Sequence, residues 1–579
     1  MKGSFQLKRF LAPFFLGVLT TAYFFLPAHY DPEPYHDGSQ FAGALGLTEG
    51  LATHAEVFSA YGFLTTWIQG AAVAILGPSL LSIRILTILT ILIAVLLTYS
   101  LLNSVLRKPW LSVLACSAWV VMWPGISVNW GTPLLPWPSL VYLDFQLACV
   151  VLILKIIDGV SHPRMYLFFA AFFGSLALLT RINYGLFFCL FMLFALVAFR
   201  RHIGLNHEHF APGIIGFLSP LIVSGVVLLA TSSLRDYVEQ SITGPLNGAV
   251  KTSATDLLFL ENAYLRASLP IFIALGFVLW LSRRWDCGSL VFGVVIAAVT
   301  GVLTAISTTA ILESPLRDAI LTRLTWAPGL DTQAMQACFV FAIVTIAATL
   351  GMIVVLLVRK LASSPRFLSK KSLPWNGSPM TFYLLLLAAL SSLVQLFPIA
   401  DPNHLWWAVP LPLAFTCFIL CYSASSRTTA AVACVLFAPM LLIAPFTGFR
   451  YYEVPRSEAN SPSLAGMYVK TSLASDFAKV DDFLASLEPR STKFLCHGGL
   501  FATWTGEYLA SDADYVDYAY GTDQRSLDLD PDSVVYCEER GAEGAAAEYA
   551  ETHGLRVVDE TGPISLSYFA QVNLVRLAR

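Results

Sequence analysis

Long apolar runs separated by short polar stretches dominate this chain. A helix that crosses a bilayer needs about 20 mostly apolar residues, and fourteen segments approach that length and composition. The segments are centred on residues 10–27, 61–76, 85–106, 109–124, 139–157, 165–181, 184–199, 212–231, 268–282, 288–312, 336–358, 380–399, 404–424 and 428–447. The pattern predicts a polytopic α-helical membrane protein.

The basic residues beside these segments predict how the chain is oriented, because cytoplasmic loops carry an excess of Lys and Arg. Lys2, Lys8 and Arg9 precede the first segment, and residues 359–379 contain five basic residues and no acidic one. Both stretches are therefore expected in the cytoplasm. The residues after 447 are then expected on the other side of the membrane.

An N-terminus inside and a C-terminus outside require an odd number of crossings, whereas fourteen segments were counted. One segment must then be a half-span, a surface helix or part of a merged pair. The short segments 61–76 and 109–124 are the weakest candidates. We predict about 13 transmembrane helices, and 11 remains an alternative.

Composition agrees with a membrane protein and separates a second domain. The chain is 56% hydrophobic and 13% charged, whereas a soluble domain carries roughly a quarter charged residues. Residues 449–579 hold 11 Lys/Arg against 21 Asp/Glu, a net charge of −10, and residues 1–448 hold 24 against 17, a net charge of +7. We therefore predict a transmembrane domain over 1–448 and an extracytoplasmic domain over 449–579.

The C-terminal segment has the pattern of a small soluble α/β domain. Strand-like segments alternate with helical ones. The strands are expected at 494–497, 533–537, 555–558 and 572–577, and the helices at 472–487 and 540–552. Cys496 and Cys537 lie in this segment and either pair as a disulfide or remain buried thiols.

The stretch of the chain that is richest in chemistry is a polar loop behind the first apolar segment, His29 to Gly38. It holds three carboxylates (Asp31, Glu33, Asp37) and two histidines. A carboxylate at the mouth of a membrane cavity can take a proton from an attacking hydroxyl group, and partial desolvation raises its pKa toward a useful value. Asp37 is the candidate base. The alternative is a loop whose acids only face water.

The order of several short motifs resembles the GT-C superfamily of polytopic glycosyltransferases. An acidic first extracytoplasmic loop is followed by Tyr61-Gly62-Phe63-Leu64, Leu76 to Arg84, Leu178 to Asn183, and Asp401 to Leu405. The resemblance covers most of the chain and includes glycosyltransferase family 39, the mannosyltransferases and the aminoarabinose transferases. Phe63 stands where those enzymes usually have proline. His36-Asp37-Gly38 replaces the Asp-Glu pair of protein mannosyltransferases, so protein O-mannosylation is the less favoured activity.

The resemblance implies a donor in which a sugar is joined to a polyprenyl phosphate, and a lipid-linked or cell-surface glycan as the acceptor. By position Asp37 matches the catalytic acid of the superfamily. A lipid phosphate needs cations near the bilayer surface, and Arg84, Arg181 and His404 are the candidates. His36 is assigned to substrate binding, and Asp401 to orienting His404.

The expected reaction is therefore sugar transfer with inversion in the cell (plasma or inner) membrane. A divalent cation beside Asp37 is possible in chemical terms, but no metal ligand set is predicted and a monophosphate leaving group does not require one. The tryptophans Trp123, Trp130, Trp137, Trp406 and Trp407 either stack on sugars or anchor helices at the interface. A transporter or flippase, or a polymerase or ligase of lipid-linked glycans, is the alternative function. No nucleic-acid partner is expected.

Overall fold

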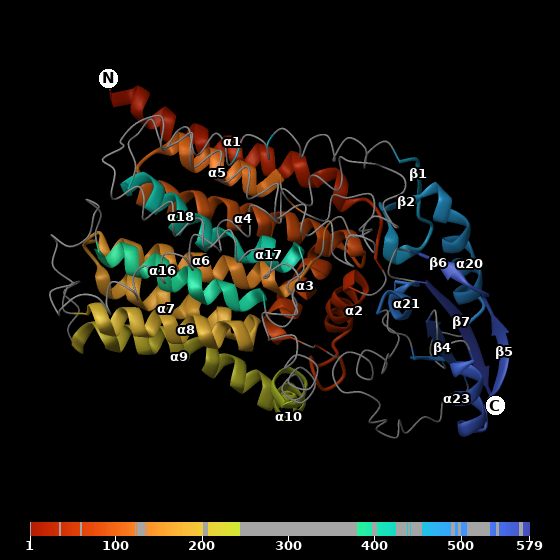
Figure 1. The fold of residues 1–579 in the computed structure, drawn as a ribbon. Helices are drawn as coiled ribbons and strands as arrows, with labels where there is room; N and C mark the ends of the chain where they lie inside the picture. Colours follow the sequence, from red (N-terminus) through yellow and green to blue (C-terminus); the bar gives the residue numbers. More distant parts are fainter. Residues whose placement is uncertain are drawn as a thin grey trace, which may run out of the picture.

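The computed structural model describes two regions, a bundle of helices and a C-terminal part that contains a β-sheet (Figure 1). The described residues are 2–33, 36–57, 59, 61–121, 123, 134, 136–200, 207–243, 379–396, 402–423, 437, 441, 454–487, 492–495, 499–506, 533–539, 544–566 and 571–579. The predicted spans 268–282, 288–312 and 336–358 lie outside the described residues, as do Asp401, Cys496, the basic stretch 359–371 and all of the predicted span 428–447 except residues 437 and 441.

The helices of the bundle follow the apolar runs of the sequence. They are α1 (Lys2–Ala28), α2 (His36–Thr48), α3 (Phe63–Leu76), α4 (Leu80–Leu106), α5 (Pro109–Val121), α6 (Pro138–Ile157), α7 (Pro163–Thr180), α8 (Ile182–Phe199), α9 (His207–Ala230), α10 (Leu234–Val238), the π-helix η1 (Glu239–Thr243), α16 (Pro379–Leu393), the 3-10 turn η3 (Val394–Leu396), α17 (Pro402–Ala408) and α18 (Pro410–Ser423).

Five described helices are long and apolar enough to cross a membrane, and they establish a multi-pass membrane protein. They are Leu11–Ala28, Leu80–Leu106, Pro138–Ile157, Pro163–Thr180 and Glu208–Ala230. Five shorter apolar helices also coincide with predicted segments: Phe63–Leu76, Pro109–Val121, Ile182–Ala198, Met380–Leu393 and Pro410–Ile419. The total of about 13 crossings stays a prediction.

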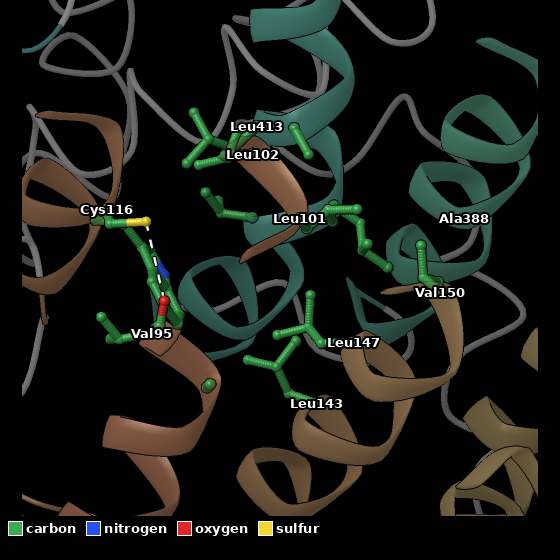
Figure 2. Packing of buried hydrophobic residues seen from close by; sticks show 14 of the residues in the cluster. Val95, Leu101, Leu102, Cys116, Leu143, Leu147, Val150, Ala388 and Leu413 are labelled. Carbon is green, nitrogen blue, oxygen red and sulfur yellow. Dashed lines mark hydrogen bonds between the residues drawn. The ribbon is translucent and has the colours of Figure 1, made fainter. Parts of the chain in front are cut away.

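One apolar core contains residues from α1 to α18, and Figure 2 shows the part of it that joins α4, α6, α16 and α18. Leu101 and Leu102 on α4, Leu147 on α6, Ala388 on α16 and Leu413 on α18 are all buried in it. Segments far apart in the sequence therefore pack as one body, with α4 and α6 at its centre.

The C-terminal part contains a mixed sheet in which β3 and β4 are parallel, β7 is antiparallel to both β4 and β5, and the order is β3-β4-β7-β5. Its elements are β1 (Arg456–Glu458), β2 (Tyr468–Lys470), α20 (Ala474–Ala485), β3 (Thr492–Leu495), α21 (Gly499–Thr503), β4 (Ser533–Glu539), α23 (Ala545–His553), β5 (Arg556–Glu560), β6 (Ile564–Ser565) and β7 (Gln571–Ala578), with 3-10 turns η4 (Pro462–Leu464) and η5 (Thr471–Leu473). Each predicted strand and helix of the tail overlaps one of these elements.

Helix α2 lies between the bundle and the C-terminal part (Figure 1). The sequence led us to expect a loop through Gly38, but the structure ends that loop at His36, where α2 begins. The helix dipole stabilises a carboxylate in the first turn of a helix. Asp37 lies in the first turn of α2 and therefore favours a helix that begins at His36. A Cβ atom on Gly38 would overlap the backbone of Leu500 on α21, so only glycine allows this close contact.

Candidate active site

The centre of the site is an ion pair between Asp37 on α2 and Arg84 on α4, and both side chains are fully buried. Arg84 Nη2 donates a hydrogen bond to Asp37 Oδ2, and the backbone N–H of Glu33 donates to the same oxygen over 3.0 Å. Arg84 lies near the start of α4, which Ser79 caps by accepting a hydrogen bond from the backbone N–H of Leu81. One carboxylate oxygen is thereby held from two directions.

Arg84 also binds the C-terminal end of α1. Its Nη1 donates to the carbonyl oxygens of Tyr30 (2.5 Å), Ala28 (3.3 Å) and Pro27 (3.4 Å), and its Nη2 donates to that of Asp31 (3.1 Å). The last carbonyls of a helix lack partners within the helix and carry its negative dipole end. The guanidinium therefore has two tasks, to cap α1 and to hold Asp37.

The second oxygen of Asp37, Oδ1, is buried and has no hydrogen-bond partner in the described structure. Burial raises the pKa of Asp37 above its ordinary value, and the neighbouring Glu33 raises it further, while Arg84 opposes both effects. A buried acceptor without a donor is costly in a folded protein. Such an oxygen can accept a proton from a hydroxyl group that is brought to it.

Glu33 and His36 complete the acidic side of the site. Glu33 is fully buried, and its Oε2 accepts hydrogen bonds from the backbone N–H of His36 (2.5 Å) and bonds His36 Nδ1 (2.9 Å). The side chain of His36 is 31% exposed. Asp37 is thus enclosed while its neighbour His36 reaches the surface of the site.

A second polar group forms around Arg181, at the break between α7 and α8. Arg181 Nη1 donates to Ser139 Oγ over 2.5 Å, and the guanidinium lies over the rings of Tyr61 and Tyr184, 4.5 and 4.2 Å from their centroids. Gly62 lies directly against the end of α7, and its N–H bonds the carbonyl of Thr180 over 3.2 Å. A Cβ atom at Gly62 would overlap the carbonyl of Leu179, so glycine is required for this close approach.

Trp137 connects the two groups. Its ring centroid is 5.4 Å from that of His36 and 5.2 Å from that of Tyr61, the ring that Arg181 covers. Trp137 Nε1 and Arg181 Nε are both buried donors without an acceptor in the described part of the chain. Two buried donors beside the same ring of Tyr61 fit an anionic oxygen that the described residues do not themselves supply.

The remaining predicted residues lie elsewhere. His404 is half-buried on α17, which packs against α6 and α18, and its ring is 5.0 Å from that of Trp407. Trp406 stacks on Trp119 with their ring centroids 4.4 Å apart, and each indole N–H bonds the carbonyl of the other residue. Both are buried, so this pair packs helices together. Asp401 is outside the described residues.

Sequence reasoning missed the mutual contact of Asp37 and Arg84, and it also missed the contact of Ser139 with Arg181 and the buried indole N–H of Trp137. The signal for Trp137 was its place before Pro138, which begins α6. Among the described residues, no group of three His, Cys, Asp or Glu side chains has the arrangement of a metal site.

Comparison with solved structures finds matches at low identity and low TM-score. ArnT from Cupriavidus metallidurans, solved with undecaprenyl phosphate, is 14% identical with a TM-score of 0.43 over 97% of each chain. AglB, the oligosaccharyltransferase of Archaeoglobus fulgidus, solved with an inhibitory peptide and a dolichol-phosphate, is 12% identical with a TM-score of 0.44 over 91% of this chain and 69% of that one. The Archaeoglobus fulgidus oligosaccharyltransferase with Zn and sulfate is 13% identical with a TM-score of 0.41, over 91% and 67%.

No family model and no curated protein matches the chain. Similarity at these TM-scores does not assign a role to any residue. The functional argument therefore starts from the contacts of Asp37, Arg84 and Arg181.

We predict that Arg84→Met destabilises the protein far more than Asp37→Asn. The arginine variant leaves a buried carboxylate and the end of α1 without their cation, which costs about 3–5 kcal/mol. Asparagine keeps an acceptor oxygen for Arg84 and for the N–H of Glu33. Thermal unfolding of the detergent-solubilised protein measures both variants.

Arg164→Met is the matched control, because Arg164 pairs with Glu208 at the surface, where both side chains are more than half exposed. Loss of an exposed pair costs no more than about 1 kcal/mol. If Arg84→Met unfolds at the temperature of Arg164→Met, the buried pair does not hold this region together.

Proposed function

We propose that this protein is an integral membrane glycosyltransferase that moves a sugar from a polyprenyl-phosphate donor to a lipid-linked or cell-surface glycan. The observation that carries the proposal is the environment of Asp37. Arg84 fixes one carboxylate oxygen, and the other is buried without a hydrogen-bond donor among the described residues. This is the arrangement that a general base requires, since the base must be positioned and must keep a free acceptor. The donor and acceptor classes come from the sequence resemblance to the GT-C superfamily.

In the proposed reaction, the acceptor hydroxyl group donates a hydrogen bond to Asp37 Oδ1. Its oxygen attacks the anomeric carbon while its proton passes to Asp37. The bond between the anomeric carbon and the phosphate oxygen breaks on the opposite side, and polyprenyl phosphate leaves with the electron pair. The configuration at the anomeric carbon inverts. The raised pKa of Asp37 makes it a stronger base than an ordinary carboxylate.

Arg181 and Trp137 are the groups that we assign to the phosphate. A charge-assisted hydrogen bond from a guanidinium to a phosphate is about twice as strong as a neutral one, and both residues have a buried donor without an acceptor. Arg84, which the sequence offered for the same task, has its Nη groups occupied by Asp37 and four carbonyls, so we assign it to holding the base.

The other predicted residues keep proposed roles. His36, half-exposed between Glu33 and Trp137, is placed to contact the bound substrate. His404, oriented by Asp401, remains proposed as a second contact to the donor. A divalent cation beside Asp37 is also retained as a proposal that removal of metal by a chelator tests.

Two observations support an extracytoplasmic site. The start of α1 and the C-terminal part lie at opposite ends of the bundle (Figure 1), and basic residues precede the first span. Cys537 in the C-terminal part is disulfide-bonded, whereas the other described cysteines are free. Disulfides persist in oxidising compartments, so we place the C-terminal part and the site beside it outside the cytoplasm.

We predict that Asp37→Asn abolishes sugar transfer in a protein that still folds. Removing a general base lowers the rate by at least about 100-fold. The measurement is transfer of radiolabelled sugar from a panel of polyprenyl-phosphate sugars to extracted membrane glycans. Asp158→Asn, an exposed acid at the far end of α6, is the matched control and keeps the wild-type rate.

Each result of this assay decides between functions. Full activity of a folded Asp37→Asn variant contradicts the role of Asp37 and leaves the reaction class standing. Failure of the wild type with every donor contradicts the transferase, and movement of a labelled lipid-linked glycan across vesicles containing the protein then supports the flippase. Formation of longer glycan chains from a lipid-linked glycan alone supports the polymerase or ligase.

We further predict that Arg181→Met and Trp137→Phe raise the KM for the donor. Loss of a hydrogen bond to a charged group costs about 1.5–3 kcal/mol, which corresponds to roughly 10- to 100-fold in affinity. Trp137→Phe keeps an aromatic side chain but removes the N–H donor together with the five-membered ring. Trp110→Phe, on an exposed tryptophan of α5, is the control. An unchanged donor KM in both site variants rules out this phosphate site.

A further inference from the structure

The segment before α2 is joined to the C-terminal part by a parallel β-bridge between Tyr30 and Tyr468. The N–H of Asp31 bonds the carbonyl of Tyr468 over 2.8 Å, and the N–H of Tyr468 bonds the carbonyl of His29 over 2.7 Å. Tyr468 belongs to β2, which pairs with β1. The first loop of the chain is thereby bonded to the edge of a small two-stranded sheet formed by residues more than 400 positions later.

Arg456 on β1 adds a buried ion pair to this contact. Its Nη2 lies 2.9 Å from Asp31 Oδ2, and the two side chains are only 5% and 7% exposed. The guanidinium also lies over the ring of Tyr30, 4.3 Å from the centroid. Charged groups this well enclosed interact strongly, because little solvent screens them.

The two ion pairs meet at Asp31. Its side chain pairs with Arg456, while its carbonyl oxygen accepts a hydrogen bond over 3.1 Å from Arg84 Nη2, the same nitrogen that donates to Asp37. Two acids and two arginines therefore form one connected group. Arg84 contacts Asp31 at its backbone carbonyl and Asp37 at its carboxylate, so the ion pair of Arg84 is with Asp37, and that of Asp31 is with Arg456.

We propose that Arg456 is a positioning residue for Asp37: by neutralising the carboxylate of Asp31, it leaves Arg84 to hold the catalytic base. The inference rests on the proposed function of Asp37 and extends it to the C-terminal part of the chain. That part then has a definite task in the reaction. Its attachment decides whether the base is held in its working position.

The expected consequence of losing Arg456 follows from charge and proximity. The carboxylate of Asp31 loses its ion pair with Arg456, and it draws Arg84, which already bonds the carbonyl of the same residue, away from Asp37. Arg84 contributes most of the lowering of the pKa of Asp37, and the backbone N–H of Glu33 contributes the rest, so that pKa rises further. Asp37 is then protonated over a wider pH range and is also less well placed.

The experiment compares Arg456→Met with the double variant Asp31→Asn, Arg456→Met. The single change lowers kcat roughly tenfold, leaves the donor KM within about twofold, and moves the acid limb of the kcat profile up by roughly one pH unit. The double variant removes the competing charge and restores kcat to within about threefold of the wild type.

Lys479→Met is the control for loss of a cation from the same part of the chain, because Lys479 pairs with Asp476 at the surface. A role limited to docking leaves the acid limb at its wild-type position in both variants, because loss of the ion pair then changes stability and not the ionisation of Asp37. Absence of rescue, or an acid limb that does not move in Arg456→Met, overturns the proposal.

A second readout does not depend on transfer. Dicyclohexylcarbodiimide reacts with protonated carboxyl groups in apolar surroundings, and mass spectrometry of the peptide that contains Asp37 measures the adduct at each pH. Labelling of Asp37 extends to higher pH in Arg456→Met, and its pH range returns to that of the wild type in the double variant. If the wild type transfers no sugar, the proposed function fails, and an unchanged labelling profile overturns the positioning role by itself.

Discussion

The ion pair between Asp37 and Arg84 is the interaction on which the rest of this structure depends. Both side chains are fully buried, and two charges removed from water are stable only when their hydrogen bonds are satisfied. Arg84 meets that condition through the carbonyl groups at the end of α1. Asp37 meets it at one oxygen alone. The imbalance leaves a desolvated acceptor in an otherwise satisfied region, which is why we assign the chemistry to this position.

Three distant segments of the chain enclose that pair. The end of α1 supplies carbonyl groups, α4 supplies the arginine, and the C-terminal part covers α2 through the contact of Gly38 with Leu500. The helices provide a rigid base, since α4 shares one apolar core with α6 and α18. Catalytic geometry on packed helices is held more closely than geometry on a free loop. Residues more than 400 positions apart in the sequence therefore enclose one ion pair.

The sequence predicted those features that depend on local pattern. Apolar runs located the long described helices, and the carboxylates beside the first span made Asp37 the candidate base, because an acid at a membrane surface is conspicuous in an apolar chain. It did not predict that α2 begins at His36, since the dipole and packing that favour this start are not visible in composition. Nor did it pair Arg84 with Asp37 or Arg456 with Asp31. Those partners are chosen by tertiary packing, and the preference of arginine for phosphate suggested another role for Arg84.

The pH dependence of sugar transfer at saturating donor tests the central claim most directly. The base works only when unprotonated, so the rate falls as the pH falls through the pKa of Asp37. Burial raises that pKa above the ordinary value of 3.8. The account predicts an acid limb that follows a single ionisation with its midpoint clearly above 3.8. A rate that stays constant down to that value contradicts it, because the transferring enzyme would then not depend on a buried carboxylate base.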